Sequence, residues 1–145
     1  MYLSEIYIEN FRIFGSKQDG KYLHLDLAPG LTVIVGENDS GKSAIVDAIR
    51  HVLWTTSLEY HRLTEDDFHI VGSEHARHLI VRCRFDDLAN REQARLLEWL
   101  SIEEGMPCLY VTLQAVWLDD ESAGGGRRHR IAVTVRSGKM GKGPP

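Results

Sequence analysis

The sequence has few of the residues that build disulfide scaffolds or membrane spans. Its 145 residues include only two cysteines, Cys83 and Cys108, and neither belongs to a C-x-x-C pair. We therefore expect two reduced thiols in the core of a cytoplasmic protein. No apolar run approaches the roughly 20 residues that cross a bilayer. The N-terminus also lacks the basic and apolar segments of a signal peptide. These absences predict a chain with no membrane partner.

An excess of positive charge is also missing. The chain carries 17 Lys and Arg against 21 Asp and Glu, which gives a net charge of -4. This balance does not indicate a generally basic nucleic-acid surface. His75 and His78 are spaced to meet on a helix, but no companion ligand is evident, so we expect no metal site there. The hydrophobic fraction of 43% is typical of a globular chain, and the length indicates one domain or part of one.

One stretch carries a complete phosphate-binding motif. Residues 36–43 read Gly-Glu-Asn-Asp-Ser-Gly-Lys-Ser, which is the P-loop pattern G-x-x-x-x-G-K-[ST]. The β-branched run at 31–35 before it predicts a buried strand. The apolar residues after Ser43 recur at helical spacing and predict a helix. The motif therefore lies between a strand and a helix, as its mechanism requires.

Each residue type in this motif has a physical role. The two glycines allow a tight turn and a close approach of the backbone to phosphates. Successive backbone N–H groups and the positive end of the helix then attract the anion. The lysine places its charge on the β- and γ-phosphates, and the serine hydroxyl binds Mg²⁺. We therefore predict ATP and Mg²⁺ as cofactors, with Lys42 as the catalytic residue, Ser43 as the Mg²⁺ ligand, and nucleotide-binding residues Gly36, Glu37, Asn38, Asp39, Ser40, Gly41, Lys42, Ser43 and Ala44.

The rest of the chain alternates between strand and helix patterns. Apolar and polar residues alternate in five stretches, which predicts five strands. The last two flank a Gly-rich turn at 122–126 and predict a β-hairpin. Residues 87–102 show helical spacing, and Thr64 followed by acidic residues is typical of a helix start. The predicted strands are 2–11, 22–27, 77–86, 108–117 and 131–135.

Three charged groups leave a choice between function and structure. Asp119, Asp120 and Glu121 superficially resemble a Walker B end, but the preceding residues alternate, so we favour an exposed hairpin end. Asp66 and Asp67 are possible metal-facing groups, although a helix N-terminal turn is favoured. The basic cluster at 127–130 is interpreted as solvated charge in preference to a phosphate contact. No water-orienting group is assigned, so we expect the isolated chain to bind ATP weakly and hardly to hydrolyse it.

Two motifs together resemble a known group of ATPases. The first is Ile6-x-Ile8-Glu9-Asn10-Phe11-Arg12, and the second is the P-loop followed by Ala44-Ile45-Val46-Asp47-Ala48-Ile49. The chain resembles the ABC-type ATPase heads of the RecF, SMC and OLD (overcoming lysogenization defect) families. Within this group it is most similar to OLD-family ATP-dependent endonucleases, because Asp39 stands where ABC and SMC P-loops usually carry Gly. Asp tolerates the positive φ of such a position.

This resemblance implies more than the residues alone establish. It implies an α/β fold, namely the N-terminal lobe of an ABC-type P-loop NTPase head with an antiparallel β-subdomain. Arg12 would lie near the nucleotide, and Gln93 or Gln114 would be the loop glutamine. Residues 1–145 would then be a partial P-loop ATPase domain. It would lack the signature motif, Walker B, the switch histidine and the Toprim nuclease domain of OLD proteins.

The resemblance also implies partners. Two heads would form a homodimer around ATP and gate DNA cleavage elsewhere in the full-length enzyme. The alternative is a RecF- or SMC-like head that serves DNA repair or bridges DNA without cutting it. Downstream sequence discriminates these two, because a Toprim carboxylate cluster supports the nuclease and a long heptad repeat supports SMC. A small-molecule kinase is a weaker third hypothesis, since Asn10-Phe11-Arg12 argues against it.

Overall fold

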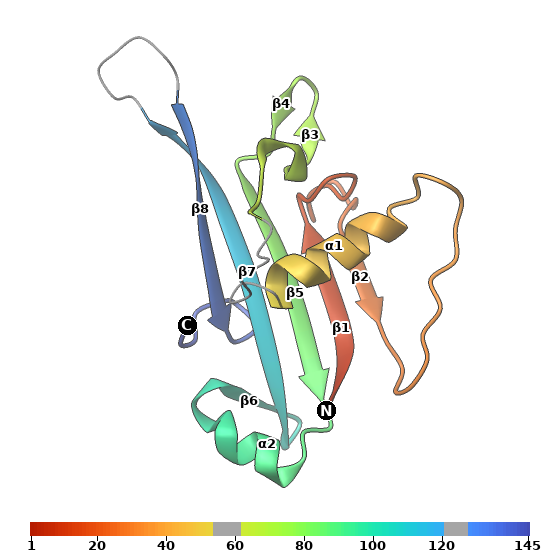
Figure 1. Ribbon diagram of the computed structural model, residues 1–145, viewed down its shortest axis with the longest axis vertical. Helices are drawn as coiled ribbons and strands as arrows, with labels where there is room; N and C mark the ends of the chain where they lie inside the picture. The colour runs from red at the N-terminus through yellow and green to blue at the C-terminus, as the bar shows by residue number, and fades with distance from the viewer. Residues whose placement is uncertain (54–61, 121–127) are drawn as a thin grey trace.

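The protein folds around one antiparallel sheet with a helix across it (Figure 1). A computed structural model describes residues 1–53, 62–120 and 128–145. The strand order is β2-β1-β5-β7-β6, and β8 also pairs with β7. Every pairing within this sheet is antiparallel. The strands are β1 (Tyr2–Glu9), β2 (Leu23–Asp26), β5 (His78–Asp86), β6 (Leu100–Glu103), β7 (Met106–Asp120) and β8 (Arg128–Ser137).

The alternating patterns place one apolar face of the sheet in the core, as predicted. Leu79, Val81 and Cys83 of β5 have no exposed surface. In the register with β1, Cys83 lies opposite Ile6 and Val81 opposite Ile8. Both cysteines are buried and free, which confirms the expected core thiols. Burial raises the pKa of the Cys83 thiol to about 12, so this thiol is uncharged at neutral pH.

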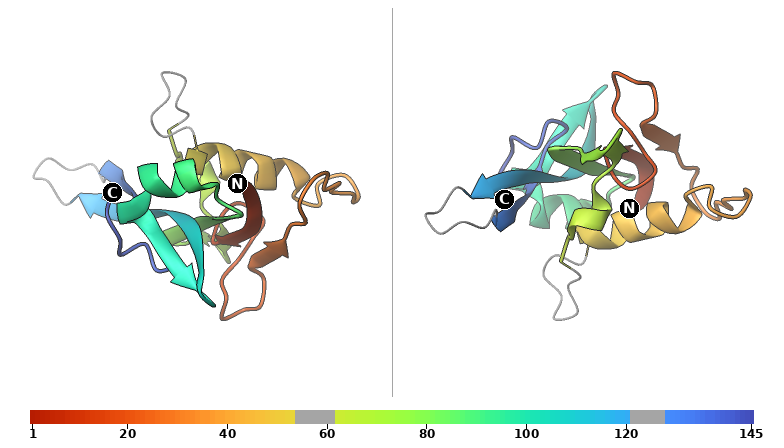
Figure 2. Two further views of the ribbon diagram at one scale, coloured as in Figure 1. Left: turned by 90° about the horizontal axis from the view of Figure 1, so that it is seen from below. Right: turned by 90° about the horizontal axis from the view of Figure 1, so that it is seen from above.

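Helix α1 (Lys42–Leu53) covers this apolar face. It packs against β5 and β7, and the two views of Figure 2 show it on one side of the sheet only. Its buried residues are Ala44, Ile45, Ala48, His51 and Val52. On the opposite face, the C-terminal segment 138–145 contacts the sheet. There Thr112 donates a hydrogen bond to the Gly138 carbonyl at 3.0 Å, and Arg82 donates to the Lys139 carbonyl at 2.9 Å.

The strand expected at 31–35 is absent, and this prediction was wrong. The backbone there has no strand assignment, and Leu31, Val33 and Val35 are 89%, 68% and 83% exposed. A buried strand needs a hydrogen-bonding neighbour, and no strand within the described residues pairs with this segment. The apolar run therefore lies open along the right-hand side of the molecule in Figure 1.

The helix expected at 87–102 is also mostly replaced. Helix α2 spans only Asn90–Arg95, a short 3₁₀ turn η2 follows at Leu97–Trp99, and Leu100–Glu103 is β6. Glu104 and Gly105 have φ values of 53° and 80°. Two successive positive φ angles form the turn that joins a tight hairpin. The β6–β7 hairpin hydrogen bonds therefore prevail over the helical spacing of the apolar residues.

The remaining segments agree with the sequence patterns where they are described. The acidic turn after Thr64 is the 3₁₀ helix η1 (Glu65–Asp67). Strands β7 and β8 form the predicted hairpin, whose expected turn at 122–126 lies outside the described residues. A second small hairpin, β3 (Ile70–Val71) and β4 (Glu74–His75), was not predicted. None of the helices in the described ranges is long and apolar enough to cross a membrane.

Candidate nucleotide-binding site

The P-loop wraps around the ammonium group of its own lysine. Lys42, the first residue of α1, donates hydrogen bonds from Nζ to the carbonyl of Gly36 at 2.7 Å and to the carbonyl of Glu37. The Ser40 hydroxyl accepts a third at 3.3 Å. Asp39 and Gly41 take φ values of 63° and 91°, and these left-handed residues make the turn that brings the loop to α1. The lysine is thus held at the positive end of a helix.

A cavity of about 540 Å³ opens beside this loop. The backbone of Gly41 lies against the Ile13 side chain, and a Cβ added at Gly41 would clash with that side chain. Glycine is therefore required there by its positive φ and by this close approach. The residues around the cavity are Ile13, Asn38, Asp39, Gly41, Lys42 and Ser43.

The cavity offers the groups that a polyphosphate requires. It contains one ammonium group, an exposed serine hydroxyl and the N-terminal end of a helix whose first turn holds no acidic residue. Such a set favours an anion and leaves a hydroxyl for a divalent cation. Lys42 and Ser43, the predicted phosphate and Mg²⁺ residues, both line this cavity. Gly36, Glu37 and Ser40 contact Lys42, and Ala44 faces the core with 6% of its surface exposed.

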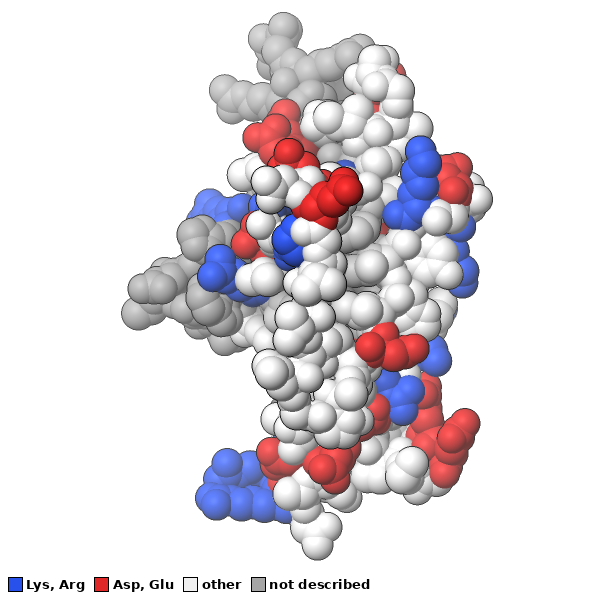
Figure 3. Space-filling view, turned by 90° about the vertical axis from the view of Figure 1, so that its right-hand side faces the viewer, with Lys and Arg blue, Asp and Glu red and all other residues white. Residues whose placement is uncertain are grey.

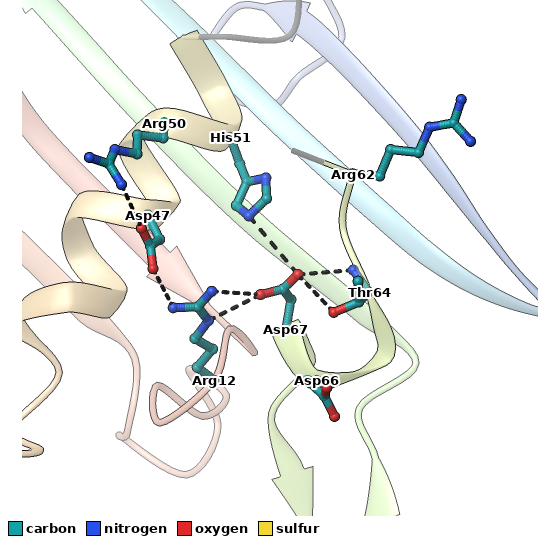
Figure 4. A pocket seen from close by; sticks show the side chains of 8 residues that line it. All are labelled: Arg12, Asp47, Arg50, His51, Arg62, Thr64, Asp66 and Asp67. Carbon is teal, nitrogen blue, oxygen red and sulfur yellow. Dashed lines mark hydrogen bonds and ion pairs between the residues drawn. The ribbon is translucent and has the colours of Figure 1, made fainter. Parts of the chain in front are cut away.

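Arg12 lies in a second cavity, where it joins two carboxylates (Figure 4). Its Nη1 lies 2.6 Å from Asp47 on α1, and its Nη2 lies 3.0 Å from Asp67 in η1. The backbone N–H of Arg12 also donates to the Asp67 carbonyl at 2.9 Å. Burial alone would lower the pKa of Arg12, but the hydrogen bonds that its guanidinium donates to Asp47 and Asp67 outweigh burial and raise that pKa. Arg12 is therefore a fixed cation that ties α1 to η1.

Asp67 lines the same cavity as Arg12 and contacts several of its neighbours. Its side chain is 7% exposed and accepts a hydrogen bond from the backbone of Thr64 at 2.9 Å. The Nε2 of buried His51 lies 4.0 Å from it. These contacts make Asp67 the capping group of the turn, in line with the favoured interpretation. The cavity measures about 520 Å³ and is surrounded by Arg12, Asp47, Arg50, His51, Arg62, Thr64, Asp66 and Asp67.

Sequence reasoning did not identify several of these residues. Ile13 was passed over because an apolar side chain carries no phosphate chemistry of its own. Asp47 and His51 had a usable signal, since they follow Ser43 by one and two turns of α1. Asp47 and His51 therefore lie on the same face of α1 as Ser43. Three acidic residues superficially resemble a Walker B end. Asp119 and Asp120 lie at the end of β7, in the hairpin with β8, and Glu121 lies outside the described residues.

The sequence of the chain matches a known family. Residues 5–119 match the AAA domain family. The chain belongs to this family. Among curated relatives, it is 36% identical over 70 residues to the chromosome partition protein Smc of Mycoplasma genitalium. It is 51% identical over 57 residues to Smc of Methanocaldococcus jannaschii. It is also 30% identical over 79 residues to the DNA double-strand break repair Rad50 ATPase of Pyrococcus abyssi.

These alignments cover about half of this AAA-domain chain and a small part of each relative. They include 48%, 39% and 52% of the chain, and 7%, 4% and 9% of the respective relatives. The chain therefore spans less than a tenth of the length of the proteins it matches. These matches confirm the predicted similarity to SMC-like ATPase heads and do not extend to the narrower OLD assignment.

A solved structure extends the likeness to nearly the whole AAA-domain chain. It comes from work on ATP-driven dimerization and DNA-stimulated activation of SMC ATPases, and it covers 96% of this chain and 73% of its own. The TM-score is 0.54 at 20% identity, a likeness that concerns the fold. The predicted fold class is confirmed: the antiparallel sheet with α1 is the N-terminal lobe of a P-loop NTPase head.

Proposed function

We propose that this chain is the nucleotide-binding lobe of an SMC- or RecF-like ATPase head that binds Mg-ATP through residues 36–43. The observation that carries the proposal is the loop geometry, in which Lys42 begins α1 and its ammonium group lies at the mouth of a cavity. An arriving triphosphate would replace the loop carbonyls and the Ser40 hydroxyl as partners of that ammonium group. Ser43, exposed in the same cavity, would hold Mg²⁺, which supplies charge neutralisation at the phosphates.

The second cavity supports a place for the rest of the nucleotide. Asp47 and His51 lie four and eight positions beyond Ser43 on α1, which corresponds to about 6 and 12 Å along the helix at 1.5 Å per residue. A nucleotide extends over a comparable length from its terminal phosphate to its base. The resemblance implies that Arg12 lies near the nucleotide, and we propose that it lies beside the sugar or the α-phosphate. To contact a phosphate, Arg12 would have to bind it with a guanidinium that also pairs with Asp47 and Asp67.

The open run at 31–35 supports the partial-domain hypothesis. A strand that precedes a P-loop is ordinarily buried within a parallel sheet, whereas here the described strands form only an antiparallel one. We propose that residues 1–145 are one lobe of the ATPase domain. Strands from a second lobe would pair with 31–35. The lobe would then act in a protein that dimerises around ATP and works on DNA, as expected for a relative of chromosome-partition and DNA-repair ATPases.

An OLD-type endonuclease is the second candidate. The observation that favours it is Asp39. This residue adopts φ of 63°, a conformation that glycine adopts without strain, yet the chain carries Asp there. The charge on the molecule does not favour one candidate over the other. On the face in Figure 3, Lys and Arg alternate with Asp and Glu around an uncharged area. A Toprim carboxylate cluster downstream of Pro145 in the gene would identify the nuclease, and a long heptad repeat would identify the SMC-like protein.

The first experiment measures Mg-ATP binding and turnover by the isolated chain beside Lys42→Ala. We expect weak binding in the wild type that is lost in Lys42→Ala, with no turnover in either. Removal of the lysine charge deprives the phosphates of their cation while α1 keeps its core contacts. Lys17→Ala, a change in an exposed loop far from the P-loop in sequence, serves as a control for the loss of one positive charge. Robust Lys42-dependent hydrolysis would contradict the partial-domain proposal.

A further inference from the structure

One imidazole and two carboxylates converge on the sheet face opposite α1, away from the P-loop lysine. They are Glu5 of β1 and His24 and Asp26 of β2. The His24 Nε2 lies 3.6 Å from Glu5 Oε2 and 3.9 Å from Asp26 Oδ1. One ligand atom from each of the three residues lies within 4.8 Å of the other two. The nucleotide site uses none of these groups.

The strand register builds this cluster. Glu5 lies directly opposite Asp26 in the β1–β2 pair, and His24 shares a face with Asp26 because side chains on a strand repeat every two residues. Like charges directly opposite each other in an antiparallel pair are unfavourable. The register therefore places two carboxylates side by side, and a bound cation would remove the electrostatic repulsion between them.

Neighbouring side chains hold two of these groups in place. Arg82 of β5 contacts Oε1 of Glu5 at 3.4 Å, so the other oxygen is left facing His24. The edge of the His24 ring meets Tyr7 at 6.3 Å between ring centroids and an interplanar angle of 66°. The Glu5 side chain is 12% exposed, whereas that of Asp26 is 88% exposed. The site thus has a fixed inner carboxylate, a supported imidazole and one side open to water.

We propose that Glu5, His24 and Asp26 bind one divalent cation of the zinc type, separate from the Mg²⁺ of the P-loop. Imidazole nitrogen together with carboxylate oxygen suits Zn²⁺, Ni²⁺ or Cu²⁺. Donor atoms of a tetrahedral zinc with bonds of about 2.0–2.1 Å lie about 3.3 Å apart. The separations from His24 are 3.6 and 3.9 Å and all three ligand atoms lie within 4.8 Å of one another, so rotation of the exposed Asp26 side chain would bring them to that geometry. Water completes the coordination on the open side.

Such an ion would fasten the edge of the sheet. Within the described residues β2 is four residues long and pairs with β1 alone. A cation shared by Glu5 and Asp26 would link these two strands through their side chains. Residues 27–35, which lead from β2 to the P-loop, would then start from a fixed strand.

The test is calorimetric titration of the nucleotide-free, Mg²⁺-free chain with Zn²⁺ alone. We expect one zinc per chain in the wild type, and binding weakened by at least about tenfold in His24→Gln and in Asp26→Asn, because each loses one of three ligands. His75→Gln is the matched control, since His75 lies in the other hairpin and stacks on Trp117. It should bind zinc as the wild type does. Circular dichroism checks that each variant is folded.

Two results would overturn the zinc site. The first is equal zinc binding in the wild type and His24→Gln, or a loss in His75→Gln alone, because the ion would then lie elsewhere. The second is the absence of zinc binding to the wild type up to millimolar concentration, which would leave His24 as an ordinary partner of the two carboxylates. A melting temperature raised by Zn²⁺ in the wild type but not in Asp26→Asn would support the proposed link between β1 and β2.

Discussion

Strand β5 and the segment 31–35 both contain Leu, Ile and Val side chains, but only β5 buries them. In β5 apolar residues alternate with charged residues, and its Leu79 and Val81 have no exposed surface, whereas Leu31 and Val35 are 89% and 83% exposed. Strand β5 lies between β1 and β7 beneath α1, whereas no described strand pairs with 31–35. The difference shows that an apolar run becomes a strand only where neighbouring backbones complete its hydrogen bonds.

The largest expected effect comes from making the same substitution in both regions. Leu79→Ala removes buried methyl groups and leaves a cavity, so we expect it to lower the free energy of unfolding by about 2–5 kcal/mol. Leu31→Ala changes an exposed side chain and should stay within about 0.5 kcal/mol. Urea unfolding followed by tryptophan fluorescence measures both. If Leu31→Ala cost as much as Leu79→Ala, the segment 31–35 would have to be buried in solution.

A smaller effect concerns the ion pairs that connect the P-loop helix to η1. Arg12→Ala leaves buried Asp67 without its guanidinium partner, and we expect it to lower the free energy of unfolding by about 1–3 kcal/mol. Arg50→Ala is the matched control, because Arg50 is half exposed and its contact with Asp47 is 3.4 Å long. Its cost should be below about 1 kcal/mol. Equal costs in the two variants would show that Arg12 does not tie α1 to η1.

The smallest effect lies within the exposed loop itself. Asp39 has φ of 63°, which glycine adopts freely and alanine adopts at a cost of about 1–2 kcal/mol. We therefore expect Asp39→Gly to leave stability nearly unchanged and to tighten ATP binding several-fold, because a negative charge beside the phosphates is removed. Asp39→Ala should bind ATP more weakly than Asp39→Gly. Titration with a fluorescent ATP analogue measures both, and the reverse order would exclude a left-handed residue at this position.

Local sequence patterns were sufficient to predict most strands of the sheet and to identify the P-loop motif. The alternation in β1, β5 and β7 identified the apolar face of the sheet because side chains on a strand repeat every two positions, although Cys108, Tyr110 and Thr112 on the other face of β7 are buried as well. The lysine and glycines of the P-loop were evident because their spacing reflects a backbone requirement. The sequence failed where the outcome depends on distant partners. Whether 31–35 is a strand depends on a neighbouring strand, and whether 100–103 is helix or strand depends on the Glu104–Gly105 turn and on β7.

The ion pairs of Arg12 were hidden for the same reason. Asp47 and Asp67 lie 35 and 55 positions from Arg12 in the chain, and no local pattern indicates that they meet. The capping role of Asp67 was visible because Thr64 is only three residues away. The α/β pattern was thus predictable from periodicity and one motif and the ATPase-head fold from the resemblance, whereas the walls of the second cavity required the tertiary structure.

The strand order has a consequence for synthesis on the ribosome. The P-loop helix emerges before β5 and β7, the strands against which it packs. Strands β1 and β2 can pair early, but the nascent chain must reach Asp86 before β1 meets β5, and β7 is complete only at Asp120. Until then, the apolar side of α1 has no sheet to cover it. The P-loop helix is therefore made early, and its apolar side is covered late.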